Sequence, residues 1–311
     1  MKPKTFNEVA ALWKADKRQY VKKSTYAIYA QLCNAYILPE FGGASALDED
    51  GIQAFANRLL ARGYAIKTVK DTMLVLKMIV RYGEKLGAWP HVEFKLRYPT
   101  QVDVPRPIVT LSDQHLNKLL RYLREHFSFK NLGILICLHS GMRIGEVCGL
   151  QWRDLDIAAG VIRVNKTVQR ITISDGAIRE DYVAVDVPKT ASSVREIPIA
   201  REVKEMIRPF KKVMPPENYV ISGGPQPLEP RTYRRYFKRL LLQLEIPPLR
   251  FHGLRHSFAT RCIESKCDYK TVSVILGHAS ISTTMDLYVH PGFAEKKRCI
   301  DRMARGMGGL V

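Results

Sequence analysis

Apolar residues recur every three or four positions through most of the first hundred residues, which is the spacing of helices that bury one face. Thr5 precedes the first such stretch and Glu8 follows it three positions later, the pattern of a capping box. Pro39 is expected to end the second helix, because proline removes a helical hydrogen bond and clashes with the preceding turn. We therefore predict four helices, over residues 5–20, 24–38, 48–62 and 66–86, in a compact helical domain.

A proline-rich stretch then interrupts the helical pattern. Residues 98–110 contain three prolines and follow neither a helical nor a strand period. Because proline fixes φ and lacks an amide hydrogen, this stretch is expected to be an extended linker. Helical spacing resumes at Leu111, with Ser112 as the expected N-cap. The sequence thus predicts a helical domain over residues 1–97, a linker over 98–110 and a second domain over 111–311.

The second domain mixes helical and strand periodicity. Strands are expected where valine and isoleucine gather, and polar residues 189–193 are expected to form a hairpin tip between the last two of them. Helical spacing returns after Arg201 and is expected to break at Pro209. The predicted strands are 161–168, 182–187 and 194–199, and the predicted helices are 112–126, 132–150, 230–244 and 294–305. The predicted fold class is mainly α with a small antiparallel β-sheet, a helical domain followed by an α+β domain.

Composition narrows the class of protein. Hydrophobic residues make up 46% and charged residues 25%, as in globular proteins. No apolar run has the length of a membrane-spanning helix, and no signal peptide is recognisable, so we expect a cytoplasmic protein without a membrane partner. The six cysteines lack a Cys-x-x-Cys pair, and Cys262 and Cys267 have no second ligand pair nearby. Neither a disulfide framework nor a metal site is therefore expected.

The charge of the chain points to its partner. Lysine and arginine number 49 against 30 aspartates and glutamates, a formal net charge of +19. The excess runs through both predicted domains and is not confined to a tail. A polyanion is the natural partner of such a chain, and nucleic acid is the commonest one. Charge alone names no chemistry, and a basic protein without such a partner is the alternative.

Four short segments gather the residue types that handle a phosphate diester. Arg143 and Glu146 are three positions apart, which puts them on one face of a helix, and His252 and Arg255 have the same spacing. Arginine, histidine and lysine clamp and protonate phosphates. Tyr288 among such cations is a potential nucleophile, because they favour its phenolate. Taken singly, each residue has an ordinary interpretation as a surface ion pair, a helix cap, a solvated lysine or a core tyrosine.

Taken together, the segments resemble one family, the tyrosine recombinases or phage integrases. The family's catalytic set is, in chain order, Arg, Lys, His-x-x-Arg, His or Trp, and Tyr. The surrounding motifs here read S-G-M-R-I-G-E-V-C-G-L, P-K-T-A-S-S-V-R-E-I-P-I, H-G-L-R-H-S-F-A-T and L-G-H-A-S-I-S-T-T-M-D-L-Y-V-H. Gly253 departs from the polar residue that many members carry there. The matching catalytic residues are Arg143, Lys189, His252, Arg255, His278 and Tyr288.

The resemblance covers residues 111–311, which it identifies as an α+β tyrosine recombinase catalytic domain with a C-terminal tail. The helical domain, residues 1–97, resembles the SAM-like core-binding domain of the family, with a weaker signal. The resemblance implies site-specific recombination, in which Tyr288 attacks a DNA phosphate, forms a 3′-phosphotyrosyl intermediate and expels a 5′-hydroxyl. Strand exchange then proceeds through a Holliday junction, and neither a metal ion nor another cofactor is implied.

The resemblance also implies roles for the other catalytic residues. Arg143 and Arg255 are expected to hold the non-bridging oxygens of the phosphate. His252 and His278 are expected to hydrogen-bond the same phosphate, with His252 accepting the tyrosine proton. Lys189 is expected to protonate the leaving 5′-oxygen. Three expectations concern the surroundings: Glu146 supports the site by orienting His252 or Arg143, His256 and His290 have structural roles, and Thr283 and Thr284 position the tyrosine helix.

The implied partner is double-stranded DNA with a specific core site. Self-association to a tetramer on two DNA sites is implied, with the helical tail docking on a neighbouring subunit, and accessory DNA-bending or directionality proteins are possible partners. The implied location is the cytoplasm, at the nucleoid. Basic residues at helix starts and along the helix 230–244 are candidate DNA contacts, with a solvated charge as the alternative for each; they are Lys22, Lys23, Lys67, Arg231, Arg234, Arg235 and Lys238.

Several functions remain open on the sequence alone. Integration or excision of a phage or other mobile element is the first, and Xer-like chromosome-dimer resolution and DNA inversion are the others within the family. Because the chain starts close to the helical domain, we expect no additional arm-binding domain, which argues against the larger accessory-dependent integrases. A topoisomerase of the type IB kind would relax DNA without exchange between sites. A DNA-binding module with an inactive site would form no covalent adduct.

Overall fold

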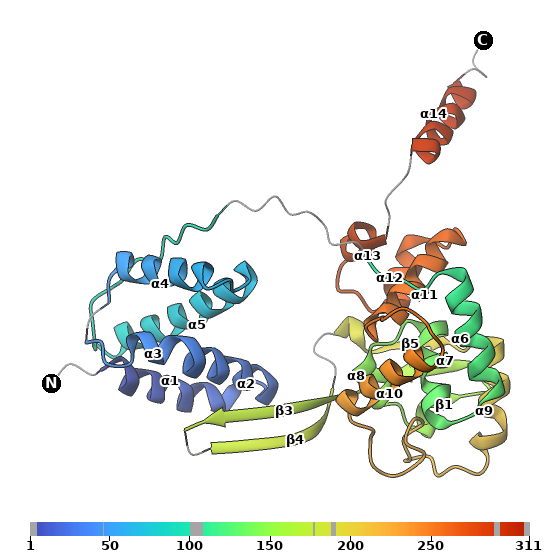
Figure 1. Cartoon of the computed structure of the whole chain (residues 1–311), viewed down its shortest axis with the longest axis horizontal. Helices are drawn as coiled ribbons and strands as arrows, with labels where there is room; N and C mark the ends of the chain where they lie inside the picture. Colours follow the sequence, from blue (N-terminus) through green and yellow to red (C-terminus); the bar gives the residue numbers. More distant parts are fainter. Residues whose placement is uncertain are drawn as a thin grey trace. The chain divides into compact units, whose positions relative to one another are not determined.

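The structure is a computed structural model that describes residues 5–45, 47–99, 108–176, 178–187, 191–288 and 293–307 (Figure 1). The chain divides into two compact units. The first comprises Met1–Pro105 together with Ile171–Tyr182, and the second comprises Arg106–Arg170 together with Val183–Val311. The first unit is therefore assembled from two separate stretches of chain.

Among its described residues, the first unit is built mostly from five α-helices. The capping box at its start is confirmed, because the Thr5 hydroxyl accepts from the Glu8 amide while the Glu8 carboxylate accepts from the Thr5 amide. The apolar faces that were read from the sequence pack into one core, in which Phe6 and Trp13 are almost fully buried. The helices are α1 (Phe6–Tyr20), α2 (Lys23–Leu32), α3 (Leu38–Phe41), α4 (Glu49–Ala61) and α5 (Ile66–Lys85).

The expectation that Pro39 ends the second helix is wrong. The chain widens into a π-helical turn, Cys33–Ile37, and continues helical as α3, with Pro39 in its first turn. The π turn changes the backbone hydrogen-bond pattern immediately before Pro39, so the proline falls where the helical pattern is already interrupted. The amide of Leu38 reaches back to the carbonyl of Cys33, the i to i+5 bond that defines the π turn.

The second stretch of the first unit is the tip of a β-hairpin. Strands β3 (Thr167–Asp175) and β4 (Ile178–Asp186) form a two-stranded sheet, and their turn contains Gly176 at a φ of +59°. Ile173 is buried, and the Asp175 carboxylate pairs with Lys14 and accepts a 2.6 Å hydrogen bond from Tyr26. Burial opposes ionisation of Asp175, but the hydrogen bonds from Lys14 and Tyr26 outweigh it and lower the pKa of that carboxyl. The hairpin tip is thus held in the helical unit by a paired charge.

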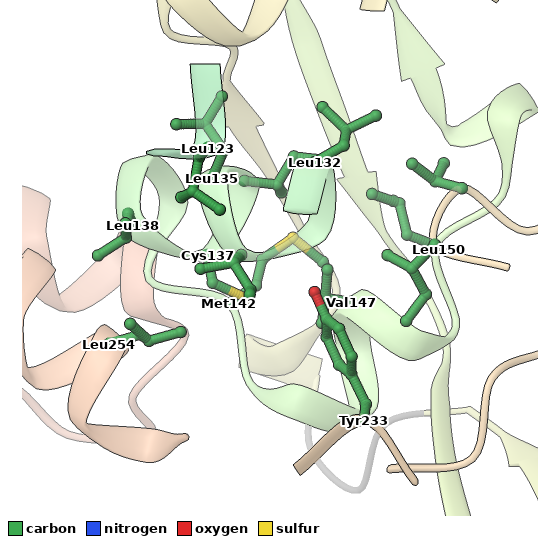
Figure 2. Packing of buried hydrophobic residues seen from close by; sticks show 14 of the residues in the cluster. Leu123, Leu132, Leu135, Cys137, Leu138, Met142, Val147, Leu150, Tyr233 and Leu254 are labelled. Atoms are coloured by element: carbon green, nitrogen blue, oxygen red, sulfur yellow. The ribbon is translucent and has the colours of Figure 1, made fainter. Parts of the chain in front are cut away.

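The second unit surrounds a helix that is buried along most of its length, α7 (Phe129–Ser140). Figure 2 shows Leu123, Leu135, Val147, Tyr233 and Leu254 from five different helices gathered in this core. The other helices are α6 (Asp113–Glu125), α8 (Ile144–Cys148), α9 (Arg201–Lys211), α10 (Pro230–Gln243), α11 (His252–Glu264), α12 (Tyr269–Leu276), α13 (Ile281–Tyr288) and α14 (Phe293–Met307). In the described part of the chain, no helix combines the length and the apolarity that crossing a bilayer requires.

The strand pairing differs from the prediction. A three-stranded antiparallel sheet has the order β1 (Leu155–Asp156), β2 (Val161–Val164), β5 (Arg195–Pro198). β5 pairs with β2, with Ile197 opposite Ile162, and β4 pairs with β3. The expected hairpin between residues 182–187 and 194–199 is therefore wrong. Apolar and polar residues alternate in both segments in the same way. This alternation indicates which face of each strand is buried, but it does not indicate which strand pairs with it.

Two helix boundaries were also misplaced. The predicted helix 132–150 is divided at Gly141, whose φ of +63° is left-handed, so α7 ends before it and α8 begins after Arg143. A Cβ at Gly141 would lie 2.6 Å from side-chain atoms of Leu276 and Phe258, which leaves room only for glycine. In contrast, α9 runs through Pro209, because the proline falls in its last turn and costs a single helical hydrogen bond.

Candidate active site

Five of the six predicted catalytic residues lie at helix ends of the second unit. Arg143 is the N-cap of α8 in an extended conformation, and His252 and Arg255 occupy the first turn of α11. His278 follows the left-handed Gly277 that ends α12, and Tyr288 is the last residue of α13. The sixth residue, Lys189, lies outside the described residues, as does His290. At helix ends, side chains project past the last turn and unpaired backbone groups remain to orient them.

Arg255 is the most deeply buried of these residues, with only 2% of its surface exposed. Its Nη1 donates 2.8 Å hydrogen bonds to the carbonyls of Gly141 and Leu276. Its Nη2 is buried and has no hydrogen-bond partner among the described residues. Burial, and after it the charge of Arg143, lowers the pKa of the guanidinium. The site therefore holds a fixed positive charge with an unused donor, an arrangement that an anion would complete.

Arg143 is held by backbone and side-chain contacts. Its Nη2 donates to the Gly277 carbonyl at 3.0 Å, and its Nη1 donates to Glu146 Oε1 at 2.9 Å. Because Arg143 is an N-cap and not a helical residue, the expected shared helix face is wrong. Glu146 instead reaches back from the third position of α8 and also accepts from the Arg143 amide at 2.8 Å. The arginine is thereby fixed while its side chain stays 36% exposed.

A further arginine, Arg195, is part of the site and was missed in the sequence. Its side chain is 5% exposed and makes two hydrogen bonds to the Glu146 carboxylate, at 3.1 and 3.0 Å. Its Nε donates to the Ile275 carbonyl at 2.6 Å. The signal that could have revealed it is its register, two positions before the buried Ile197 and thus on the inward face of β5. A charged residue at an inward position requires a buried partner.

The two predicted histidines are held as neutral imidazoles. Burial, followed by the charge of Arg255, lowers the pKa of His278 to about 4. His252 is the more exposed of the two; desolvation by the surrounding protein, followed by the neighbouring His256, lowers its pKa to about 4. The Nδ1 of His278 is 2.8 Å from the hydroxyl of the buried Thr284, which orients the ring. Each imidazole can therefore offer one N–H to a bound phosphate at neutral pH.

Tyr288 meets a histidine to which the sequence analysis gave a structural role. The Nδ1 of His256 is 2.6 Å from the Tyr288 hydroxyl, and the two ring centroids are 5.7 Å apart. Burial raises the pKa of Tyr288, and the charge of Arg255 partly opposes this. The spacing from His252 could have indicated the contact, because residues four apart share one face of α11.

The candidate DNA contacts fall in both units. On α10, the side chains of Arg231, Arg234, Arg235 and Lys238 are exposed. Two of them, Arg234 and Lys238, line a cavity of about 790 Å³ that His252 also lines. In the first unit, Lys22, Lys23 and Lys67 are exposed. Lys67 pairs with Asp71 at 3.0 Å, which reduces its free charge. Arg234 and Lys238 thus adjoin the predicted catalytic site, and the three lysines belong to the separate helical unit.

Replacing Glu146 by alanine is expected to lower the free energy of unfolding by about 3–5 kcal/mol, because it leaves the buried charge of Arg195 without its partner. Burial opposes ionisation of Glu146, but the hydrogen bonds and charge of Arg195 prevail and lower the pKa of the carboxyl. A lowered carboxyl pKa stabilises the fold above the unfolded pKa, and this stabilisation is lost as pH falls through the folded pKa. The difference between wild type and Glu146→Gln is therefore expected to be largest at neutral pH and to shrink under acid conditions.

Chemical denaturation at a series of pH values measures both effects. Glu205→Ala is the matched control, because Glu205 pairs with Arg201 on the exposed surface of α9. It is expected to change the free energy of unfolding by roughly 0.5 kcal/mol or less. A Glu146→Ala protein as stable as the control variant would contradict the proposed importance of this network.

The site presents two arginines, two neutral imidazoles and a tyrosine hydroxyl, which is the chemical set for an enzyme that acts on a phosphodiester. Comparison with known proteins agrees. The profile of the Phage integrase family matches residues 110–295, and that of the phage integrase N-terminal SAM-like domain matches residues 5–60. The first match alone covers more than half of the chain. The protein belongs to the phage integrase family, the tyrosine recombinases.

Curated relatives include a tyrosine recombinase XerC-like protein of Caldanaerobacter subterraneus, 27% identical over 81% of this chain and 69% of the relative. The ICEBs1 integrase of Bacillus subtilis is 27% identical over 92% of this chain and 78% of its own length. Among solved structures, an integrase of transposon Tn1549 in complex with a circular intermediate DNA is 22% identical, with a TM-score of 0.74, over 96% of this chain and 99% of that one. A lambda integrase tetramer bound to a Holliday junction is 18% identical, with a TM-score of 0.65, over 92% and 78%.

These findings confirm the predicted fold class, a helical domain followed by a mainly helical catalytic domain with small antiparallel sheets. They also confirm the predicted enzyme class. The protein is a site-specific DNA recombinase, an enzyme that cleaves and rejoins DNA strands.

Proposed function

We propose that this recombinase integrates and excises a mobile DNA element, using Tyr288 as the nucleophile that forms a 3′-phosphotyrosyl bond. One observation carries the residue assignment. The Tyr288 hydroxyl contacts a histidine beside Arg255, and Arg255 keeps a buried donor that no described residue uses. A buried, unused guanidinium donor is costly unless an anion completes it, and a scissile phosphate is the anion that this enzyme class handles.

Arg255 and Arg143 bind the non-bridging oxygens of that phosphate. Charge develops on these oxygens as the tyrosine attacks, so fixed donors stabilise the transition state more than the ground state. Both arginines are already oriented by backbone carbonyls, Arg255 by those of Gly141 and Leu276 and Arg143 by that of Gly277. The charge is therefore in place before the substrate arrives, and little reorganisation is needed.

The remaining residues donate hydrogen bonds, transfer protons or hold the arginines in place. His252 and His278, both neutral, donate to the phosphate and hold it in line with the tyrosine. Lys189 protonates the 5′-oxygen as it leaves. Glu146 acts indirectly, because it holds Arg143 and Arg195. The covalent bond to tyrosine stores the energy of the broken phosphodiester, so rejoining uses no separate energy source.

The partner is double-stranded DNA with a specific core site, and the active assembly is a tetramer on two such sites. DNA-bound integrases of the same fold support the DNA partner, and the lambda integrase tetramer on a Holliday junction supports the assembly. A feature of α14 fits it too, because Phe293, Ile300 and Met303 share one face and are 84%, 60% and 51% exposed. We propose that this face packs on a neighbouring copy, that accessory DNA-bending or directionality proteins set the outcome, and that the enzyme works in the cytoplasm at the nucleoid.

Mobile-element integration is preferred over chromosome-dimer resolution because the ICEBs1 integrase aligns with 92% of this chain and the Tn1549 integrase shares its fold with a TM-score of 0.74. The XerC-like relative keeps resolution as the second candidate. The two roles differ in their substrates. An integrase joins two sites of different flanking sequence, whereas a resolution enzyme joins two identical sites.

The experiment that tests the proposal traps the covalent intermediate. The wild-type protein is incubated with randomised duplexes nicked close to the cleavage position, so that a short fragment diffuses away and religation fails. Adducts are denatured, their DNA is sequenced and the modified peptide is mapped. The expected result is one enriched DNA motif attached at Tyr288. Attachment at another residue, or DNA binding without any adduct, would contradict the assignment. Pairs of DNA sites that contain the enriched motif then separate the two roles. Recombination between sites of different flanking sequence supports integration, and recombination between identical sites supports resolution.

A further inference from the structure

The contact between His256 and Tyr288 has a geometry suited to proton transfer. The distance of 2.6 Å between His256 Nδ1 and the phenol oxygen is that of a short hydrogen bond. The two residues come from different helices, α11 and α13, so the contact depends on how the catalytic domain packs and does not arise from neighbouring sequence positions. Tyr288 also packs against the small apolar cluster formed by Ala259, Val272 and Leu276.

The surroundings of His256 favour the neutral imidazole. His256 is half-buried, and burial followed by the charge of Arg255 lowers its pKa. Among the described residues, the titratable or charged groups shown to act on it are Arg255 and His252 on α11 and Tyr288 on α13. The His252 ring meets it edge to face, with 4.6 Å between centroids. A protonated phenol therefore faces a neutral imidazole, and the phenol O–H is the donor.

We propose that His256 positions the Tyr288 hydroxyl and accepts its proton when the tyrosine attacks DNA, an inference that rests on Tyr288 being the nucleophile. The O–H bond of Tyr288 breaks and its proton moves to His256 Nδ1. The phenol oxygen forms the bond to phosphorus, the bond from phosphorus to the 5′-oxygen breaks, and the 5′-oxygen takes a proton from Lys189. During rejoining the deoxyribose 5′-hydroxyl attacks phosphorus and returns its proton to the neutral amine of Lys189. The bond from phosphorus to the phenol oxygen breaks, and the His256 imidazolium returns its proton to that oxygen.

This assignment differs from the one that the family resemblance implies, in which His252 takes the proton. In the described residues, the imidazole that hydrogen-bonds the Tyr288 hydroxyl is that of His256. His252 contacts the ring of His256 and lines the cavity beside α10. His252 is therefore left free to bind the phosphate, and His256 deals with the proton of the nucleophile. The two histidines divide tasks that a single imidazole would otherwise share.

His256→Asn tests the proposal, because the asparagine side chain has an oxygen near the position of Nδ1 that accepts a hydrogen bond but takes no proton. The probe is the pool of nicked duplexes that the wild type enriches in the trapping experiment, and the readout is the single-turnover rate of adduct formation. We expect this rate to fall about 10² to 10⁴-fold, the usual contribution of a general base, with DNA affinity unchanged. His139→Asn is the matched control, since His139 also uses Nδ1 in a hydrogen bond, to the Leu135 carbonyl.

Two further readouts separate a proton acceptor from a structural residue. The wild-type rate is expected to fall as acid protonates His256, and His256→Asn is expected to lose this acid limb. The slow His256→Ala variant is expected to recover part of its rate in added imidazole. A His256→Asn rate within threefold of wild type would overturn the proposal, and so would an equal loss at every pH without imidazole rescue. If the adduct instead maps to a residue other than Tyr288, the proposed function itself fails, whatever His256 does.

Discussion

Replacing Tyr288 by phenylalanine is expected to abolish covalent attachment to DNA, with a rate loss on the order of 10⁶-fold, as for the removal of other enzyme nucleophiles. The substitution removes a single oxygen and keeps the ring that packs on Ala259 and Leu276. The fold loses one hydrogen bond, to His256, worth about 0.5–1.5 kcal/mol. The variant should therefore bind the enriched duplexes as the wild type does while forming no adduct.

Tyr269→Phe is the matched control for this prediction. Tyr269 begins α12 in the same domain, is 36% exposed and carries the same functional group. Its variant should form adducts at the wild-type rate. Gel analysis after denaturation, with binding measured in parallel by mobility shift, gives both quantities for each protein. Equal adduct yields from Tyr288→Phe and wild type would rule out Tyr288 as the nucleophile and leave the family assignment of the chain intact.

Features that depend on local sequence were predicted well. The capping box at Thr5 and the cap at Ser112 lie where the sequence placed them, because a cap is set by residues within one turn. The basic helix that begins at Pro230 was also predicted, since proline fits a helix start. The motifs around the predicted catalytic residues identified the family, and the family implied the fold. Each of these features depends on residues that are close together in the sequence.

Features that depend on contacts between distant residues were not predicted. The break at Gly141 follows from the close approach of Leu276 and Phe258, which lie more than a hundred residues away. The pairing of β5 with β2 places Arg195 against Glu146, and neither its strand partner nor its ion pair is visible in the local pattern. Residue types and periodicity show that a side chain is buried, but the choice of its partner belongs to the tertiary structure.

The same limit explains why the contact between His256 and Tyr288 was not predicted. A histidine after the predicted catalytic arginine resembles any other residue of α11, and its neighbour Tyr288 is 32 positions away. The contact exists because α13 packs against α11 in the folded domain. Sequence motifs identify the residues that a family shares, and tertiary packing determines which of their atoms are in contact. Because this site is built from the ends of several helices, its hydrogen bonds depend on how those helices pack.

Replacing Arg255 by lysine is expected to lower the rate of adduct formation about 10² to 10³-fold, the usual cost of one transition-state donor. Lysine keeps the charge but replaces a planar fork with a single nitrogen. That nitrogen cannot span the carbonyls of Gly141 and Leu276 and also reach the phosphate, whereas Arg255 uses Nη1 for both carbonyls and keeps Nη2 available. The rate should fall far more than the DNA affinity, because affinity comes from many phosphate contacts along the duplex.

Arg261→Lys is the matched control on the same helix, since Arg261 pairs with Asp113 near the surface. Its adduct rate should equal that of the wild type. Single-turnover rates at saturating protein isolate the chemical step, and a denaturation curve shows whether Arg255→Lys remains folded. If the folded Arg255→Lys protein cleaved within tenfold of wild type, charge alone would suffice at this position. The unused Nη2 donor of Arg255 would then not be required to bind the phosphate.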